Sequence, residues 1–137
     1  MVQFPTTTTT GSADVPYHFL PNSSAHPRTE VFSFHGGGIV NIPMTFTQGG
    51  ITPQPITVTG RVVGANGLGL RNVVVTITDE NGNVRSATTS AFGFYSFDQV
   101  LTGYGYFFKP NSRAYRFSQN WALAYVNMPP VNFTGQE

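Results

Sequence analysis

The chain has 137 residues, enough for one domain of about 80–120 residues and an appendage. Charged residues make up 9% of the chain, against about 25% in an average soluble protein, and the net charge is +1. Because no Lys or Arg cluster occurs, we expect no nucleic-acid or anionic-membrane partner. The lack of cysteine excludes disulfides and thiolate zinc sites, and no apolar run is long enough to span a membrane.

The composition also bounds the fold and the compartment. With 15 Gly and 10 Pro spread through the sequence, no long helix is expected. The start, MVQFPTTTTTG, has neither the basic nor the apolar region of a signal peptide. The chain is therefore either cytoplasmic or a mature form without its leader. From the polar, Thr-rich, low-charge composition we expect the second: an exported protein, extracellular or at the cell surface, whose leader is not present in this sequence.

Residues 1–55 form an extended arm rich in Thr, Pro and Gly, in which two segments alternate like β-strands. In EVFSF (30–34) phenylalanines alternate with polar residues. In IVNIPMTF (39–46) apolar residues recur at every second position, and Pro43 confines the segment to a sheet edge or a bulge. Such a strand needs a sheet, since burying four of these side chains contributes about 6–10 kcal/mol.

The arm has two candidate partners. It can fold back on its own domain, or it can cross the triple glycine or the GGITPQP linker and extend the open sheet edge of a neighbouring copy. We favour the neighbour, because the arm is long, stiffened by proline and able to form strands, and the sandwich has open edges and few charges. Such a head-to-tail contact builds an open filament, and the low charge limits repulsion between packed subunits. The side chains expected to fill apolar slots on the receiving subunit are Val31, Phe32, Phe34, Val40, Ile42, Met44 and Phe46.

The stretch FHGGG (34–38) is similar to the HGGG run in the oxyanion hole of lipases and esterases. That chemistry also needs a G-x-S-x-G nucleophile elbow, which this chain lacks, and an α/β-hydrolase needs roughly twice this length. We therefore interpret the glycines as a hinge or tight turn between the two strand segments, and we expect no enzymatic activity.

Residues 56–137 contain seven short alternating segments with a turn signal about every 8–12 residues, which is typical of a β-sandwich. The segments are 56–63, 73–79, 84–89, 93–97, 104–108, 114–117 and 131–134. Asn81-Gly82 predicts a type I′ hairpin turn, since both residues tolerate positive φ. The expected fold is all-β: a seven-stranded antiparallel β-sandwich preceded by the extended arm with one or two strands.

A motif pattern runs through this second half: a G-x-V strand, a Gly-bearing loop, an apolar strand, a T-x-x-x-G-x-F-x-F segment and a G-x-x-Y strand. The matching residues are Gly60, Val62, Val73, Val75, Ile77, Thr89, Gly93, Tyr95, Phe97, Gly103 and Tyr106. In this pattern the chain resembles the carboxypeptidase regulatory-like domain, a transthyretin-like or Cna-B-like sandwich, over about residues 56–135.

The resemblance implies the sandwich fold and a role as an accessory module of peptidases, outer-membrane receptors or surface and adhesive proteins, without choosing among them. Ser90 stands where many relatives have Asp after the Thr. That departure removes a turn-capping carboxylate and argues against calcium at this position.

No metal or cofactor is expected. His18, His26 and His35 do not have the spacing of a zinc site, and no cysteine accompanies them. Asp79-Glu80-Asn81 lacks the register and the distal Glu of a calcium loop, so we interpret it as a solvated hairpin tip.

Several aromatic residues do not fit the inward face of the sandwich: Tyr104, Phe107, Trp121 and Tyr125. They are suited either to stacking on sugar rings or to covering a subunit interface. We favour the interface, because Tyr and Trp are enriched there.

Covalent glycans are a further candidate partner. Two sequons occur, beginning at Asn22 and Asn132, and the run Thr6, Thr7, Thr8, Thr9 and Thr10 is a candidate for O-glycans. A disordered tail is the alternative interpretation of the threonine run.

The leading hypothesis is therefore a non-enzymatic extracellular structural protein, a subunit of a filament or surface polymer built from copies of itself. The alternative is a monomeric adhesion or carbohydrate-binding module that uses Tyr104, Trp121 and Tyr125. A third reading, a peptidase accessory domain, requires a catalytic domain that these 137 residues do not contain.

Overall fold

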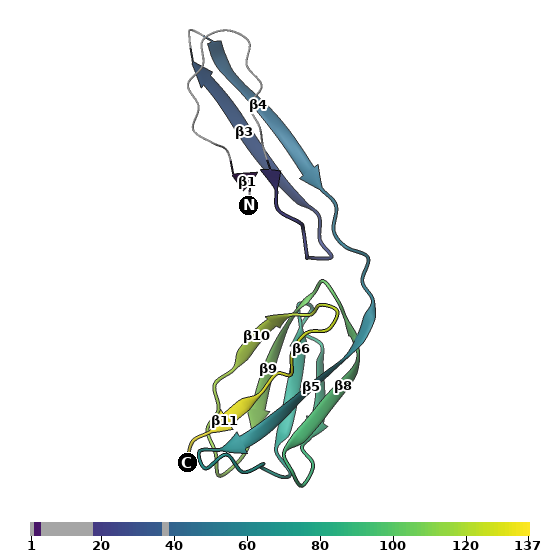
Figure 1. Ribbon diagram of the computed structural model, residues 1–137, viewed down its shortest axis with the longest axis vertical. Coiled ribbons are helices and arrows are strands. Elements are labelled where there is room, and N and C mark those ends of the chain that lie inside the picture. Colours follow the sequence, from purple (N-terminus) through teal and green to yellow (C-terminus); the bar gives the residue numbers. More distant parts are fainter. Residues whose placement is uncertain (1, 4–17, 37–38) are drawn as a thin grey trace.

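A computed structural model of the chain describes residues 2–3, 18–36 and 39–137, with the backbone alone described at 2–3, 34–36 and 39–42. Every regular element in these ranges is a β-strand, which confirms the predicted all-β class. The strands are β1 (Val2–Gln3), β2 (His18–Phe19), β3 (Arg28–Gly36), β4 (Ile39–Gln48), β5 (Pro55–Gly64), β6 (Val74–Asp79), β7 (Val84–Thr88), β8 (Phe94–Leu101), β9 (Gly105–Asn111), β10 (Asn120–Leu123) and β11 (Phe133–Gly135) (Figure 1). No helix of the length and hydropathy needed to cross a membrane occurs in the described ranges.

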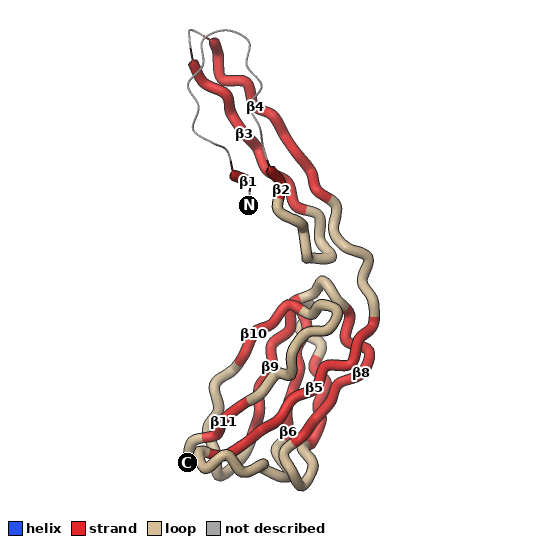
Figure 2. The backbone as a smooth tube through the Cα atoms, viewed as in Figure 1, coloured by secondary structure: helices blue, strands red, loops and turns tan. Residues whose placement is uncertain are grey.

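Two sheets in the second half of the chain face each other (Figure 2). One has the strand order β10-β9-β6-β7 and the other β11-β5-β8. Both supply the core: Val62 and Phe97 come from the smaller sheet, and Val75 and Phe108 from the larger one, all buried. The rings of Phe97 and Phe108 lie 6.4 Å apart between the layers. This is the predicted β-sandwich-like arrangement, held by alternating inward side chains.

Three details of the sandwich differ from the sequence-based expectation. The first is the connection between β6 and β7, where the predicted type I′ turn is wrong. Gly82 has a φ of 83°, but Asn81 is not among the described residues with positive φ. The Asp79 carboxylate accepts hydrogen bonds from the backbone N–H groups of Asn81 and Asn83, each at 2.9 Å. This side-chain cap stabilises a longer loop. The Asn83 side chain, which donates to the same carboxylate at 2.8 Å, and then the backbone bonds lower the pKa of Asp79.

The second difference lies between β9 and β10. The segment 114–117, predicted as a strand, contributes only a single bridge between Arg116 and Gln136, and the strand follows instead at Asn120–Leu123. Phe117 lies against Gly135, where a Cβ would meet its ring at 2.7 Å. The alternating aromatic residues of 114–117 therefore cover the end of the sandwich instead of entering a sheet.

The third difference is direction, because β11 runs parallel to β5, whereas an antiparallel sandwich was expected. Leu123, the last residue of β10, pairs with Gly105, the first residue of β9. The chain then crosses to the other sheet at the end where β5 begins (Figure 1). A strand entered from that end must run in the direction of β5.

A bulge shifts the alternation of β8. The register with β5 changes between Ile56 and Val58, and Gln99 has a φ of 56°. As a result Phe97 and Val100 are both buried, although strict alternation would have turned Gln99 inward.

Thr89 is one of two buried polar residues of the described core, and it connects the two ends of the β6–β7 hairpin. Its hydroxyl accepts from the Val73 N–H at 2.9 Å and donates to the Leu70 carbonyl at 2.6 Å. Both backbone groups would lose their partner if the hydroxyl were removed.

We expect Thr89→Val to lower the free energy of unfolding by about 1–3 kcal/mol, the cost of leaving buried polar groups unsatisfied. The matched control is Thr88→Val in the exposed strand β7, which should change stability by less than about 0.5 kcal/mol. Urea denaturation of both variants measures the difference, and equal stabilities would contradict this role for Thr89.

Candidate functional site

The predicted strands of the arm pair with each other. β3 and β4 form an antiparallel two-stranded sheet of their own, in which Phe32 lies opposite Met44 and Gly36 opposite Ile39. We expected the segment 39–46 to pair with a sheet in another molecule. This expectation is wrong for the edge of β4 that faces β3, because β3 of the same chain occupies it. The outer edges of the hairpin remain, and no strand of the sandwich pairs with either of them.

The register of the hairpin sorts the predicted assembly residues by face. Residues directly opposite each other share a face, so Phe32, Met44 and Phe46 lie on one side. Val31 lies opposite Thr45 and belongs to the other side. Met44 is 43% exposed and Val31 is 62% exposed, so apolar side chains reach solvent on both faces. The side chains of Phe34, Val40 and Ile42 lie outside the described residues, and so do Thr6, Thr7, Thr8, Thr9 and Thr10.

An aromatic cluster stabilises the base of the hairpin. The Phe46 ring lies 5.3 Å from that of Phe19 in β2 and 5.6 Å from that of Phe32. The Arg28 guanidinium donates one hydrogen bond to the Leu20 carbonyl and another to the Gln48 side chain. These contacts tie the segment before β3 to the end of β4. Met44 is not part of this aromatic cluster.

A short loop, residues 22–27, connects β2 to β3 and is held by its own side chains. The Asn22 amide donates to the carbonyls of His26 at 2.8 Å and Gly49 at 3.2 Å, and its oxygen accepts from the Ser24 N–H. The Ser24 hydroxyl accepts from the His26 N–H. The first sequon thus has a structural role, because its amide nitrogen already bonds two backbone carbonyls.

This loop docks on the sandwich through its backbone. The Ala25 N–H donates to the Gly103 carbonyl at 2.7 Å, and the Ile51 N–H donates to the Ser24 carbonyl at 2.9 Å. Glycine is required for this close approach, since a Cβ on Gly50 would lie 2.1 Å from the Ala25 oxygen. Gly103 has a φ of 84°, and a Cβ there would meet the Ala25 nitrogen at 2.7 Å.

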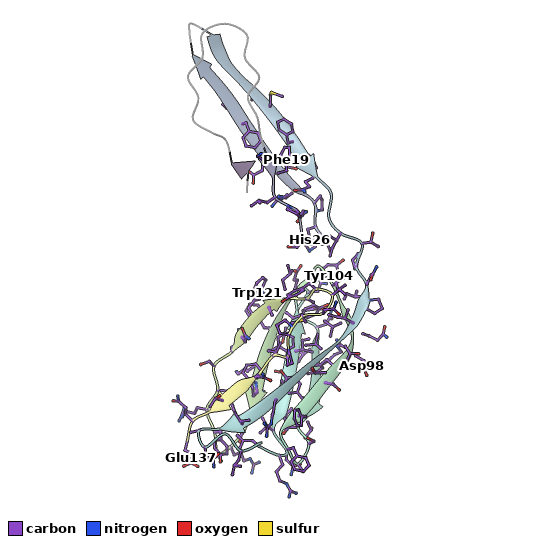
Figure 3. The ribbon with its side chains drawn as sticks, viewed as in Figure 1. Phe19, His26, Asp98, Tyr104, Trp121 and Glu137 are labelled. Atoms are coloured by element: carbon purple, nitrogen blue, oxygen red, sulfur yellow. The ribbon has the colours of Figure 1, made fainter. Side chains whose placement is uncertain are left out.

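One ion pair joins the loop to the sandwich among the described residues. His26 Nε2 lies 2.8 Å from Glu80 Oε2, and Glu80 Oε1 accepts the Gly105 N–H at 2.7 Å. The His26 ring meets the Tyr104 ring edge to face, with centroids 5.3 Å apart (Figure 3). The Gly105 N–H, followed by His26, lowers the pKa of Glu80 below its ordinary value. The sequence suggested Glu80 only as a solvated loop residue, and nothing in its spacing indicated His26 as its partner.

The candidate ligand aromatics do not form one platform. Tyr104 is half-buried at the junction, Trp121 is 55% exposed and Tyr125 is 47% exposed. Trp121 instead lies beside Phe107, its direct partner in the β9–β10 register, and its ring covers Gly105, where a Cβ would meet it at 2.8 Å. Sequence reasoning missed Phe107 as a neighbour of Trp121 because β10 was not predicted.

The remaining candidates have structural partners or no neighbours of their kind. The Asn132 side-chain oxygen accepts a hydrogen bond from the Arg61 N–H at 2.9 Å. This bond does not use the side-chain nitrogen, and Asn132 is exposed. No group of His, Asp and Glu side chains suited to a metal occurs within the described residues. The side chain of His35 lies outside them.

Comparison with known proteins defines the fold only. No protein-family model matches the chain, and no curated protein matches it. Among solved structures, the chain is similar to one described as the Bacillus anthracis TIE protein, with a TM-score of 0.51 and 13% sequence identity. The match covers 80% of this chain and 24% of that chain. The likeness thus extends beyond the sandwich of this chain and spans a small part of the longer neighbour.

The docking of the junction loop can be tested with two adjacent glycines. We expect Gly50→Ala to displace Ala25 and to raise the hydrogen-exchange rate of its N–H about tenfold or more, a loss of about 1.4 kcal/mol of local stability. Gly49→Ala is the control, because no atom lies within 4 Å of the added Cβ. An unchanged exchange rate in Gly50→Ala would contradict the docked geometry.

The Glu80 interaction predicts a pH dependence of the junction. Since the folded-state pKa of Glu80 is lowered, its contribution is present above the ordinary value of 4.5 and is lost as the pH falls through the lowered pKa. Both partners of the ion pair are more than one-third exposed, so the contribution should not exceed about 1 kcal/mol. We expect the NMR shift of the Gly105 N–H to titrate below pH 4.5.

Glu80→Gln should abolish that titration. Asp98→Asn should leave it in place, because Asp98 accepts from Thr57 on the sandwich and takes no part in the junction. A titration that persists in Glu80→Gln would assign it to another group.

Proposed function

We propose that the chain is a non-enzymatic structural subunit that joins copies of itself through the β3–β4 hairpin. The observation that carries this proposal is the exposure of apolar side chains on the hairpin. Among the described residues its strands, of 9 and 10 residues, pair only with each other, and Val31 and Met44 are exposed on opposite faces. A two-stranded sheet is marginally stable alone in water, so this one gains from further pairing and burial.

A second copy of the chain is the partner that the composition favours. Full burial of an exposed Val or Met contributes about 1.5–3 kcal/mol, and charged residues are only 9% of the chain, which limits repulsion between copies. The hairpin extends away from the sandwich (Figure 1), so a contact between the hairpin of one copy and the sandwich of the next is head-to-tail. Contacts of this kind produce fibres unless their rotation closes a ring.

The sandwich is proposed to be a carboxypeptidase regulatory-like domain with the seven-stranded, transthyretin-like or Cna-B-like topology, and residues 1–55 to be its arm. Several motif residues have structural roles that fit. Thr89, just after β7, bonds the backbone of Leu70 and Val73 ahead of β6, and Gly93 has a φ of 84° where a Cβ would meet the Val62 oxygen. Domains of this type serve many proteins, so the function rests on the hairpin.

An extracellular or cell-surface location is part of the proposal. It is supported by the low charge and by the polar, Thr-rich composition. Of the two sequons, Asn132 is the better glycan acceptor, because the Asn22 amide nitrogen bonds the carbonyls of His26 and Gly49.

The assembly proposal is tested by size-exclusion chromatography with light scattering and by negative-stain electron microscopy. We expect the full chain to form large species or fibres, and a variant lacking residues 1–46 to be monomeric. Met44→Asp should weaken assembly strongly, because it places a charge on the aromatic face of the hairpin. The control Thr45→Asp, on the other face, should weaken it less. A full chain that stays monomeric at every concentration would overturn the proposal.

The alternative function is a monomeric adhesion or carbohydrate-binding module, favoured by the exposed pair Trp121 and Phe107. The Trp121 ring lies against Gly105 and the residue is 55% exposed, so part of the ring is open to stack on a neutral ring. Under this alternative the chain is monodisperse, binds glycans on an array, loses binding in Trp121→Ala, and keeps it when residues 1–46 are deleted.

A further inference from the structure

The sandwich has four edge strands, of which β8 and β11 are covered. The outer side of β8 is occupied at three positions by side chains and by its preceding loop. Arg85 donates to the Asp98 carbonyl at 2.7 Å, the Tyr106 hydroxyl contacts both backbone groups of Leu101, and Ser90 bonds both those of Phe94. β11 has only three residues and continues into the Arg116–Gln136 bridge. Such covering is how sheet edges are protected from pairing with other chains.

β10 is an open edge without a charged residue. The Ala124 N–H bonds the Tyr104 carbonyl, so by the alternation of an antiparallel ladder Ala122 and Asn120 also bond toward β9. The backbone N–H and C=O groups of Trp121 and Leu123 therefore point outward. Within the described chain no hydrogen bond occupies them.

A groove of about 670 Å³ runs beside this edge. Its apolar lining includes Ala122, Leu123, Tyr125, Met128, Pro129 and Pro130, and Ser23 of the junction loop also borders it. Proline has no N–H to donate, so the wall at 129–130 offers contact without competing for the ladder. The groove thus combines unpaired backbone on one side with apolar surface on the other.

β7 is the remaining edge, and it suits the hairpin less well. It carries Arg85, and the cavity beside it is lined by Asp79 as well as Arg85. A hairpin that presents Val31 and Met44 would leave those charges without water. The groove along β10 has no charged side chain in its lining.

We infer that the groove along β10 receives the β3–β4 hairpin of a second copy. One strand of that hairpin pairs, along its outer edge, with the outward-pointing backbone groups of Trp121 and Leu123. The inference rests on the proposed self-assembly and names its receiving site. The hairpin of the same chain is held apart, because the Ala25–Gly103 hydrogen bond docks its base and the strands extend away from the sandwich (Figure 1). The surface and its occupant are therefore supplied by different copies.

The chain has no cysteine, so cross-linking tests the contact directly. We expect the double variant Thr45→Cys/Leu123→Cys, treated with a short bismaleimide, to give a ladder of covalent multimers on denaturing gels. Each single variant can give dimers at most. The matched control Thr45→Cys/Ser86→Cys, which probes β7, should not extend beyond dimers.

A second pair of variants tests the groove without cross-linking. Tyr125→Lys, at an exposed groove position, should raise the protein concentration needed for assembly at least about tenfold, equivalent to about 1.4 kcal/mol. Val84→Lys, exposed on β7, should leave assembly unchanged.

Failure of this inference can be told from failure of the proposed function. If the chain forms fibres but the ladder appears with Ser86→Cys or with neither pair, β10 is not the receiving site and the inference is overturned, while self-assembly stands. If the chain does not assemble at all, both fail.

Discussion

A β-strand must satisfy two requirements in water: its backbone groups need partners, and its apolar side chains need cover. The sandwich meets both, since its two sheets pair internally and enclose residues such as Phe97 and Phe108. The β3–β4 hairpin meets the first requirement only along its inner edge, and Val31 and Met44 remain exposed. The proposed role of the protein depends on this difference between the two parts of one chain.

The junction determines what the hairpin can reach. Glycine at positions 50 and 103 allows the backbone of the loop 22–27 to approach the sandwich more closely than any side chain permits. The His26–Glu80 pair and the edge-to-face contact with Tyr104 add side-chain contacts on the same surface. A hairpin anchored in this way projects outward the strand edges that no described strand pairs with, and another molecule can meet them there.

The sandwich edges differ in how well they are covered. β8 would be the longest free edge, yet Arg85, Ser90 and Tyr106 occupy backbone groups of Asp98, Phe94 and Leu101 along it. β10 is shorter, carries no charge and borders an apolar groove whose far wall contains two prolines. Protection of one edge and exposure of another is the pattern expected where pairing with a further strand is directed to a single site.

Alternation and turn residues in the sequence determined the all-β class, most of the strands and most of the inward residues between Val58 and Phe108, because a half-buried strand imposes a period of two on its own residues. Val100 was missed, because the bulge at Gln99 shifts that period. They also located both strands of the hairpin. They did not reveal that these strands pair with each other, that β10 replaces the segment 114–117, or that β11 runs parallel to β5. Nor did they connect His26 to Glu80 or Trp121 to Phe107. Strand pairing, edge cover and junction contacts join residues far apart in the chain, and their geometry depends on where the whole backbone goes, so only the tertiary structure could decide them.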